Sequence, residues 1–73
     1  MDPLTEQQAA ILNLERQFWR TAGAKEDAIR ALGLSPVRYY QRLAQLMATL
    51  EALKVDPVTV KRLQRLASRR RGI

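Results

Sequence analysis

The chain has 73 residues and a formal net charge of +6, with neither cysteine nor histidine. A chain this short forms one domain with a small core, and no disulfide or thiolate metal site can stabilise it. Histidine is the commonest general base and metal ligand, so its absence argues against an enzyme and against a metal; we expect no cofactor. The residues are 47% apolar and 27% charged, which is typical of a globular protein. Because alanine, leucine, arginine and glutamine dominate, we expect an all-α fold.

The net charge is concentrated at one end of the sequence. Residues 1–56 carry seven basic and all seven acidic side chains, and residues 57–73 carry six basic side chains and no acid. This asymmetry indicates a polyanionic partner, and nucleic acid is favoured over a lipid surface because the apolar face there lacks aromatic residues. The sequence has no apolar run of membrane-spanning length and no signal-peptide pattern. We therefore expect a cytoplasmic, nucleoid-associated protein with no membrane partner.

The first helix is predicted over residues 6–22. Thr5 is a natural N-cap that forms a capping box with the glutamine three residues later, and Gly23 is expected to follow the end of the helix. Apolar residues repeat at helical spacing along the segment. Phe18 lies on that stripe and is expected in the core, whereas Trp19 lies on its flank, where burial and exposure are equally expected.

A second, short helix is predicted over residues 25–32 and ends at Gly33.

Two acids in this half of the chain, Glu15 and Glu26, raise the question of acid–base chemistry. Each has a basic neighbour on its predicted helix surface, and neither has a cysteine or histidine beside it. We therefore interpret both as salt-bridged surface residues.

The third helix is predicted over residues 36–47. Ser35 is a suitable N-cap, and Pro36 suits the first helical position, where its missing N–H has no partner to lose. Tyr39 is expected to point into the core. Residues 48–54 either continue this helix or form a short extra turn, and the sequence leaves both open.

The last helix is predicted over residues 57–71, because Asp56 and Pro57 form another pair of N-cap and first helical residue. At 100° per residue, its apolar and basic side chains fall on opposite faces. The apolar face consists of Val60, Leu63, Leu66 and Ala67. The basic face consists of Lys61, Arg62, Arg65 and Arg69.

The stretch from residue 28 to residue 43 has the layout of a helix-turn-helix: a helix, a glycine turn at Gly33, a serine cap and a second helix. The predicted fold is a compact three- to four-helix bundle that contains this motif in a single domain, residues 1–73. An ordinary αα-hairpin inside a bundle is the structural alternative.

The outward side chains of the third helix suit contact with a major groove. Arginine pairs with guanine or phosphate, glutamine with adenine, and tyrosine can donate to a phosphate. The predicted DNA-contacting residues at this end are Ser35, Val37, Arg38, Tyr40, Gln41, Arg42 and Gln45. The basic face of the last helix would add phosphate contacts. These features predict a protein that binds double-stranded DNA, either as one copy or as a homodimer on a two-fold site, and that acts as a transcriptional regulator or as a phage or nucleoid accessory factor.

Four short stretches also carry a family resemblance: Arg16–Trp19, Gly23–Glu26, Gly33–Ser35 with Arg38–Gln41, and Asp56–Pro57 with Lys61–Leu63. They resemble a small domain-of-unknown-function family of actinobacteria and their phages. The resemblance covers residue 4 to about residue 68, and the Arg-Tyr-Tyr-Gln run is its most specific part. It implies a helix-turn-helix fold and no settled function. Between Ile29 and Gly33 this chain is one residue shorter than the usual pattern of that family.

Three alternative interpretations are kept. The chain could be a protein-interaction module that docks on RNA polymerase, a sigma factor or another host protein, with Leu12, Trp19 and Val37 as exposed anchors. The arginine-rich end could bind RNA instead of duplex DNA. The basic face of the last helix could also be only a solvated surface, although the lack of any acid after Asp56 argues against this.

Overall fold

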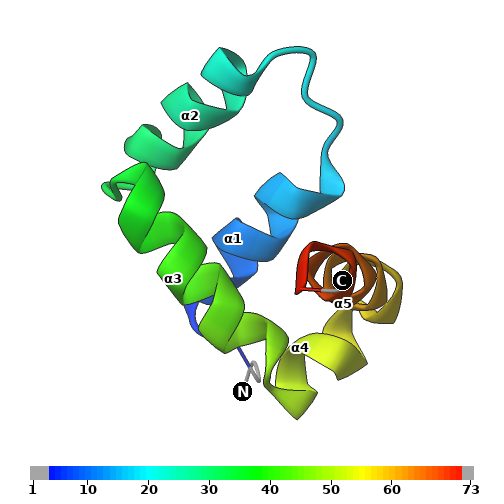
Figure 1. Ribbon diagram of the computed structural model, residues 1–73. Helices are drawn as coiled ribbons and strands as arrows, with labels where there is room; N and C mark the ends of the chain where they lie inside the picture. Colours follow the sequence, from blue (N-terminus) through cyan, green and yellow to red (C-terminus); the bar gives the residue numbers. More distant parts are fainter. Residues whose placement is uncertain (1–3, 72–73) are drawn as a thin grey trace.

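The computed structural model describes the backbone from Leu4 to Arg71 and the side chains as far as Ala67. Over this range every regular element is a helix, which confirms the predicted all-α fold class, with five helices rather than three or four (Figure 1). They are α1 (Glu6–Arg16), α2 (Ala22–Ala31), α3 (Pro36–Met47), α4 (Leu50–Val55) and α5 (Pro57–Arg71). Within the described residues, no helix is long and apolar enough to cross a membrane.

Helix α1 starts as predicted and ends earlier. The Thr5 hydroxyl accepts the Gln8 backbone N–H at 3.1 Å, and the Gln8 side chain accepts the Thr5 N–H at 2.9 Å, which completes the capping box. The helix ends at Arg16 rather than at residue 22. In a longer helix the Leu14 carbonyl would accept the N–H of Phe18, but here it accepts the Trp19 indole N–H at 2.8 Å. The Gln17 backbone N–H also donates to this carbonyl, at 3.3 Å, and Gln17 is already extended, so the carbonyl is satisfied without a further helical turn.

This early end overturns two sequence predictions. Phe18 lies in the irregular connection between α1 and α2, where 89% of its surface is exposed, so its predicted place in the core is wrong. Gly23 does not follow a helix end but lies in the first turn of α2. The Thr21 hydroxyl accepts the Ala24 N–H at 3.1 Å and so begins α2 at Ala22, earlier than the predicted start at residue 25.

The turn between α2 and α3 agrees with the sequence interpretation. Gly33 has a φ of +83° and is the one residue with positive φ in the part of the chain that is described. Glycine adopts this left-handed conformation without the steric cost that a Cβ brings. The Ser35 hydroxyl accepts the Arg38 N–H at 3.2 Å, and Pro36 begins α3 as predicted. The turn thereby sets the direction in which α3 leaves α2.

The segment that the sequence left open forms a separate helix, α4. The Thr49 hydroxyl donates to the Leu46 carbonyl at 2.8 Å and accepts the Ala52 N–H at 3.2 Å, so one side chain ends α3 and caps α4. Asp56 then accepts the Thr59 N–H at 3.2 Å, which confirms the predicted start of α5.

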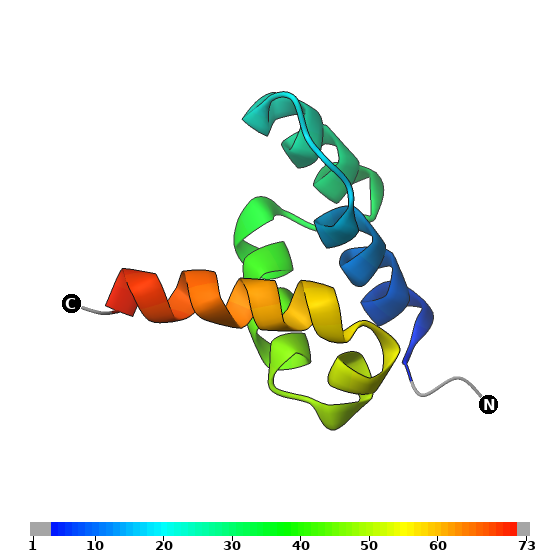
Figure 2. The same ribbon diagram turned by 90° about the vertical axis from the view of Figure 1, so that its right-hand side faces the viewer.

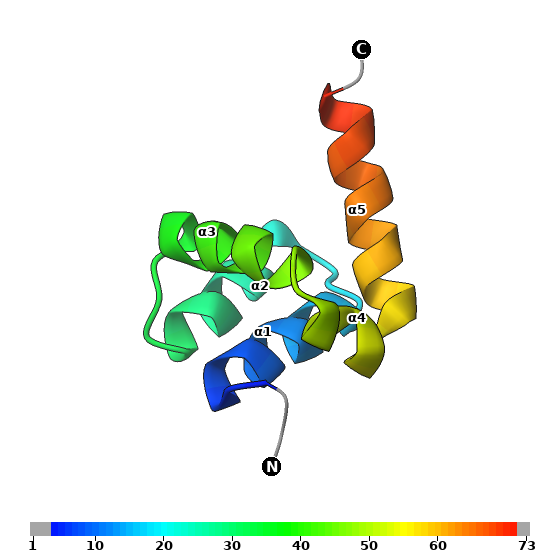
Figure 3. The same cartoon turned by 90° about the horizontal axis from the view of Figure 1, so that it is seen from below.

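The core receives side chains from all five helices. Its buried apolar side chains are Ile11, Leu12, Leu14, Ile29, Tyr39, Leu43, Leu46, Ala52 and Val60. Tyr39 is fully buried, as predicted. Leu12 is also fully buried, so its predicted place at the surface is wrong. The C-terminal part of α5 extends beyond the other helices (Figures 2 and 3). This projection accounts for the elongated shape, 40 × 27 × 20 Å.

Candidate nucleic-acid interface

The outer face of α3 presents the polar side chains that the sequence assigned to it. Val37, Arg38, Gln41, Arg42 and Gln45 are all exposed. At 100° per residue, Arg38, Gln41 and Gln45 point away from the buried side of the helix, and Arg42 lies on one flank. The predicted outward orientation of these residues is therefore confirmed.

Two further predicted DNA-contacting residues, Ser35 and Tyr40, also make contacts within the protein. Ser35 is exposed, and its hydroxyl serves as the cap of α3. Tyr40 is 49% exposed on the opposite flank of α3 from Arg42, and its ring meets the ring of Tyr39 edge-on, with centroids 5.0 Å apart. Tyr40 thus points outward, as expected, but over the gap towards α2 and α5.

The charges on α3 are not neutralised within the described structure. Helix α3 contains no acidic residue. Among residues 4–67, whose side chains are described, no ion pair involves Arg38 or Arg42; the ion pairs there are Arg16–Asp56, Lys25–Glu15 and Arg30–Glu26. Exposed and unpaired guanidinium groups are available to an external anion.

The side chains on the basic face of α5 have two different roles: some only point into solvent, and one also binds another helix. Lys61 and Arg65 are exposed and point away from the core. Arg62 is also exposed, but its Nη2 donates to the Glu15 carbonyl oxygen at 2.7 Å, which fastens α5 to the end of α1. The side chain of Arg69 lies outside the described part of the chain.

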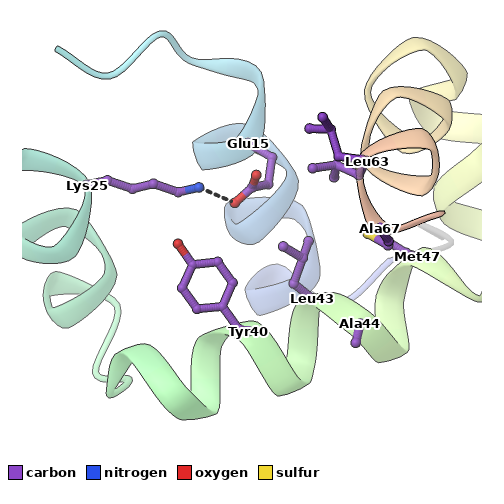
Figure 4. Close-up of a pocket in the computed structure, with 9 residues that line it drawn as sticks. Glu15, Lys25, Tyr40, Leu43, Ala44, Met47, Leu63 and Ala67 are labelled. Atoms are coloured by element: carbon purple, nitrogen blue, oxygen red, sulfur yellow. Dashed lines mark ion pairs between the residues drawn. The ribbon is translucent and has the colours of Figure 1, made fainter. Parts of the chain in front are cut away.

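A groove separates the two cationic surfaces. Its volume is about 540 Å³, and it lies between the side of α3 that carries Tyr40, Ala44 and Met47 and the side of α5 that carries Leu66 and Ala67 (Figure 4). Because apolar residues of α5 line this groove, Lys61 and Arg65 lie on the other side of that helix. The structure therefore does not merge the cations of α3 and α5 into one surface.

An ionic cluster that includes Glu15 and Lys25 lines part of the groove, and sequence reasoning missed it. Glu15 is only 7% exposed, so its predicted surface position is wrong. Its Oε2 pairs with Lys25 Nζ at 2.9 Å and accepts the hydroxyl proton of Tyr39 (Figure 4 shows the ion pair). The signal was present in the sequence, because Glu15 follows Ile11 by four residues and so lies on the same buried stripe.

The cluster also perturbs a titratable group. Burial raises the pKa of the Tyr39 hydroxyl far above its usual value near 10, and the hydrogen bond to Glu15 and the negative charge of Glu15 raise it further. The Lys25 ammonium lies 5.9 Å from the Tyr39 ring centroid and 5.5 Å from that of Tyr40. The neutral tyrosine, the carboxylate and the ammonium thus join α1, α2 and α3.

Glu26 behaves as the sequence predicted. It lies at the surface, with Arg30 Nη2 4.0 Å from its Oε2 one turn later. In the described part of the chain, acidic residues do not gather into a group of three or more that could hold a metal ion.

Comparison with known families gives a match along almost the whole chain. A family described as "Protein of unknown function (DUF3263)" matches residues 3–72. The chain belongs to the DUF3263 family. This confirms the resemblance to a domain-of-unknown-function family, whereas the actinobacterial or phage origin stays a prediction. Neither the comparison with curated proteins nor that with solved structures found a match.

Proposed function

We propose that this member of the DUF3263 family binds double-stranded DNA. In this proposal α2 and α3 form a helix-turn-helix, and α3 enters the major groove. The observation that supports it most is the outer face of α3, which exposes arginine and glutamine side chains and carries no acid of its own. An acid-free face of this kind suits a polyanion, whereas a solvated helix surface usually mixes both signs of charge.

The side chains on that face have the donors that base edges require. Arg38 and Arg42 can each give a bidentate contact to guanine or to a phosphate, and Gln41 can pair with adenine. Lys61 and Arg65 on α5 are the proposed phosphate contacts outside the α3 face. Arg62 is less available for this role because it already bonds the Glu15 carbonyl.

A salt-dependent titration of a labelled duplex with the full chain tests the proposal. We expect the Kd to rise steeply with salt. Each lost phosphate contact should reduce the magnitude of the negative slope of log K against log [salt] by about 0.9, where K is the association constant. Arg38→Ala, Gln41→Ala and Arg42→Ala should each weaken binding, by about 1–3 kcal/mol where the side chain contacts a base. Lys54→Ala, which removes an exposed charge from α4, is the matched control and should have little effect.

If all three α3 variants bind duplex DNA as tightly as the unmodified chain, α3 is not the recognition helix. If the chain ignores duplex DNA at low salt, the proposed function is wrong. Comparing a preferred sequence with random sequence then separates a site-specific regulator from a nucleoid accessory factor. Competition with single-stranded RNA tests the alternative that the basic end binds RNA.

The proposed docking on RNA polymerase, a sigma factor or another protein has less structural support. Its anchor Leu12 is fully buried, and Trp19 is partly buried with its indole N–H bonded to the Leu14 carbonyl. Val37 alone of the three named anchors is well exposed. A homodimer on a two-fold DNA site stays a prediction that sedimentation of the complex would test.

A further inference from the structure

Val37 is an apolar residue near the centre of the outer face of α3. It is the second residue of the helix, and 68% of its surface is exposed. The buried residues of α3 are Tyr39, Leu43 and Leu46. At 100° per residue, Val37 and Gln41 point most nearly opposite to this buried side, with Arg38 beside them. A ligand that lies against the outer face of α3 therefore contacts Val37 as well as the polar side chains.

Neither core packing nor helix formation accounts for a valine at this position. A side chain that stays mostly exposed contributes little to the core, and a β-branched residue is a poorer helix former than the long polar residues common at helix surfaces. An acid in the first turn would also interact favourably with the helix dipole, but the first turn of α3 carries none. The start of α3 thus presents an apolar side chain and no negative charge, which suits contact with a polyanion.

Duplex DNA has one characteristic apolar group in its major groove. Base pairs are distinguished there by hydrogen-bond donors and acceptors and by the C5 methyl group of thymine. Valine has no side-chain donor or acceptor, so it cannot bond to the polar groups of a base edge, but its methyl groups can pack against that of thymine. In a helix-turn-helix, the N-terminal residues of the second helix contact base edges, and Val37 is one of these residues.

We propose that Val37 selects thymine by packing against its C5 methyl group, within one or two base pairs of the base that Gln41 contacts. This inference rests on the proposed function, because it requires α3 to lie in the major groove. Gln41 follows Val37 by about one helical turn, roughly 5.4 Å along the axis, and successive bases of a strand are about 3.4 Å apart. Glutamine is suited to adenine, so the two side chains together favour a subsite with A·T pairs.

Replacement of thymine by deoxyuridine removes only this methyl group and so isolates the proposed contact. The full chain first selects its preferred sites from a library of randomised DNA duplexes. Each thymine of a selected site is then replaced singly by deoxyuridine, and fluorescence anisotropy measures the Kd at constant salt. Because one methyl group is buried in the contact, we expect its loss at one thymine to weaken binding about fourfold.

Variants of the chain assign the effect to Val37. Val37→Ala should bind the thymine duplex about fourfold more weakly and should bind the two duplexes equally, within about 1.5-fold. Val37→Thr keeps one of the two methyl groups and should still prefer thymine by about twofold. Gln41→Ala should weaken binding but keep the preference of about fourfold, because it leaves the methyl contact in place.

Val55→Ala is the matched control. It makes the same truncation on α4, where no DNA contact is proposed, at a valine that is 45% exposed. It should bind both duplexes as the unmodified chain does. Circular dichroism should show that all four variants are folded.

The outcomes separate this inference from the proposed function. If the chain binds duplex DNA but selects no sequence, or if no single deoxyuridine weakens its binding, Val37 does not select thymine, although α3 still binds DNA. If Val37→Ala keeps the full preference for thymine over deoxyuridine, another group contacts the methyl and the inference is wrong. If the chain binds no duplex at low salt, this inference and the proposed function are both wrong.

Discussion

Replacing Tyr39 with phenylalanine tests the buried ionic cluster with almost no change in shape. The ring of Tyr39 is fully buried and would stay packed, while the hydroxyl that donates to Glu15 is lost. A hydrogen bond to a charged group contributes about 1.5–3 kcal/mol, and a domain of this size has a total stability of only about 4–11 kcal/mol. We therefore expect Tyr39→Phe to lower the free energy of unfolding by about 1.5–3 kcal/mol.

Urea titration followed by Trp19 fluorescence and by circular dichroism measures this change. Tyr40→Phe is the matched control, because it removes the same atom from the neighbouring residue, whose hydroxyl has no hydrogen-bond partner among the described side chains. The control should change stability by less than about 0.5 kcal/mol. Equal effects of the two substitutions, or a loss below about 0.5 kcal/mol for Tyr39→Phe, would refute the stabilising role of the cluster.

Three further predictions concern the turn, the pH dependence and the connection after α1. Gly33→Ala should destabilise the fold by about 1–2 kcal/mol, because the φ of Gly33 is +83°. Gly23→Ala lies within α2 with open space around it and should stabilise the fold by up to about 1 kcal/mol. Denaturation curves that shift in the same direction for both variants would contradict this. Because the pKa of Tyr39 is raised on folding, only the unfolded chain releases this proton just above pH 10, so stability should be intact below that pH and fall by about 1.4 kcal/mol per unit above it. Tyr39→Phe should remove that dependence, and an unchanged slope in its pH titration would exclude Tyr39 as the source. Phe18→Ser should alter the melting curve little, by less than about 0.5 kcal/mol, since the side chain is 89% exposed, and a loss typical of a core residue would show that Phe18 is buried in solution.

The sequence predicted the elements that local chemistry specifies. The caps at Thr5, Ser35 and Asp56 each begin a helix as expected, because a side-chain oxygen there accepts the backbone N–H three residues later. Gly33 was predicted from the same kind of local argument. These features depend on neighbours within one turn, and so the pattern of residues alone reveals them.

Two kinds of feature were predicted less well. The first is local competition: the apolar stripe of the first helix continues through Phe18, but the Trp19 indole donates to the Leu14 carbonyl five residues earlier and the helix stops, and Thr21 caps α2 where Gly23 had indicated a helix end. The second is contact between residues that are distant in the sequence. Sequence spacing could not reveal that Arg62 bonds the Glu15 carbonyl, since the two residues are 47 positions apart.

In the candidate interface too, the features set by local sequence were predicted and those set by the tertiary structure were not. The outward direction of Arg38 and Gln41 follows from helical periodicity and was predicted. The apolar groove between α3 and α5 was not, because it depends on how α5 projects from the bundle (Figure 3). That Arg62, unlike the equally exposed Lys61 and Arg65, also tethers α5 to α1 likewise required the tertiary structure.

Amide NMR spectra of the isotope-labelled chain, recorded as a short DNA duplex is added at low salt, test the central claim most directly. If α3 contacts the duplex, the largest shift changes should fall on residues 36–45, with smaller changes around Lys61 and Arg65. Shift changes confined to the basic end of the chain, with α3 unaffected, would contradict the account.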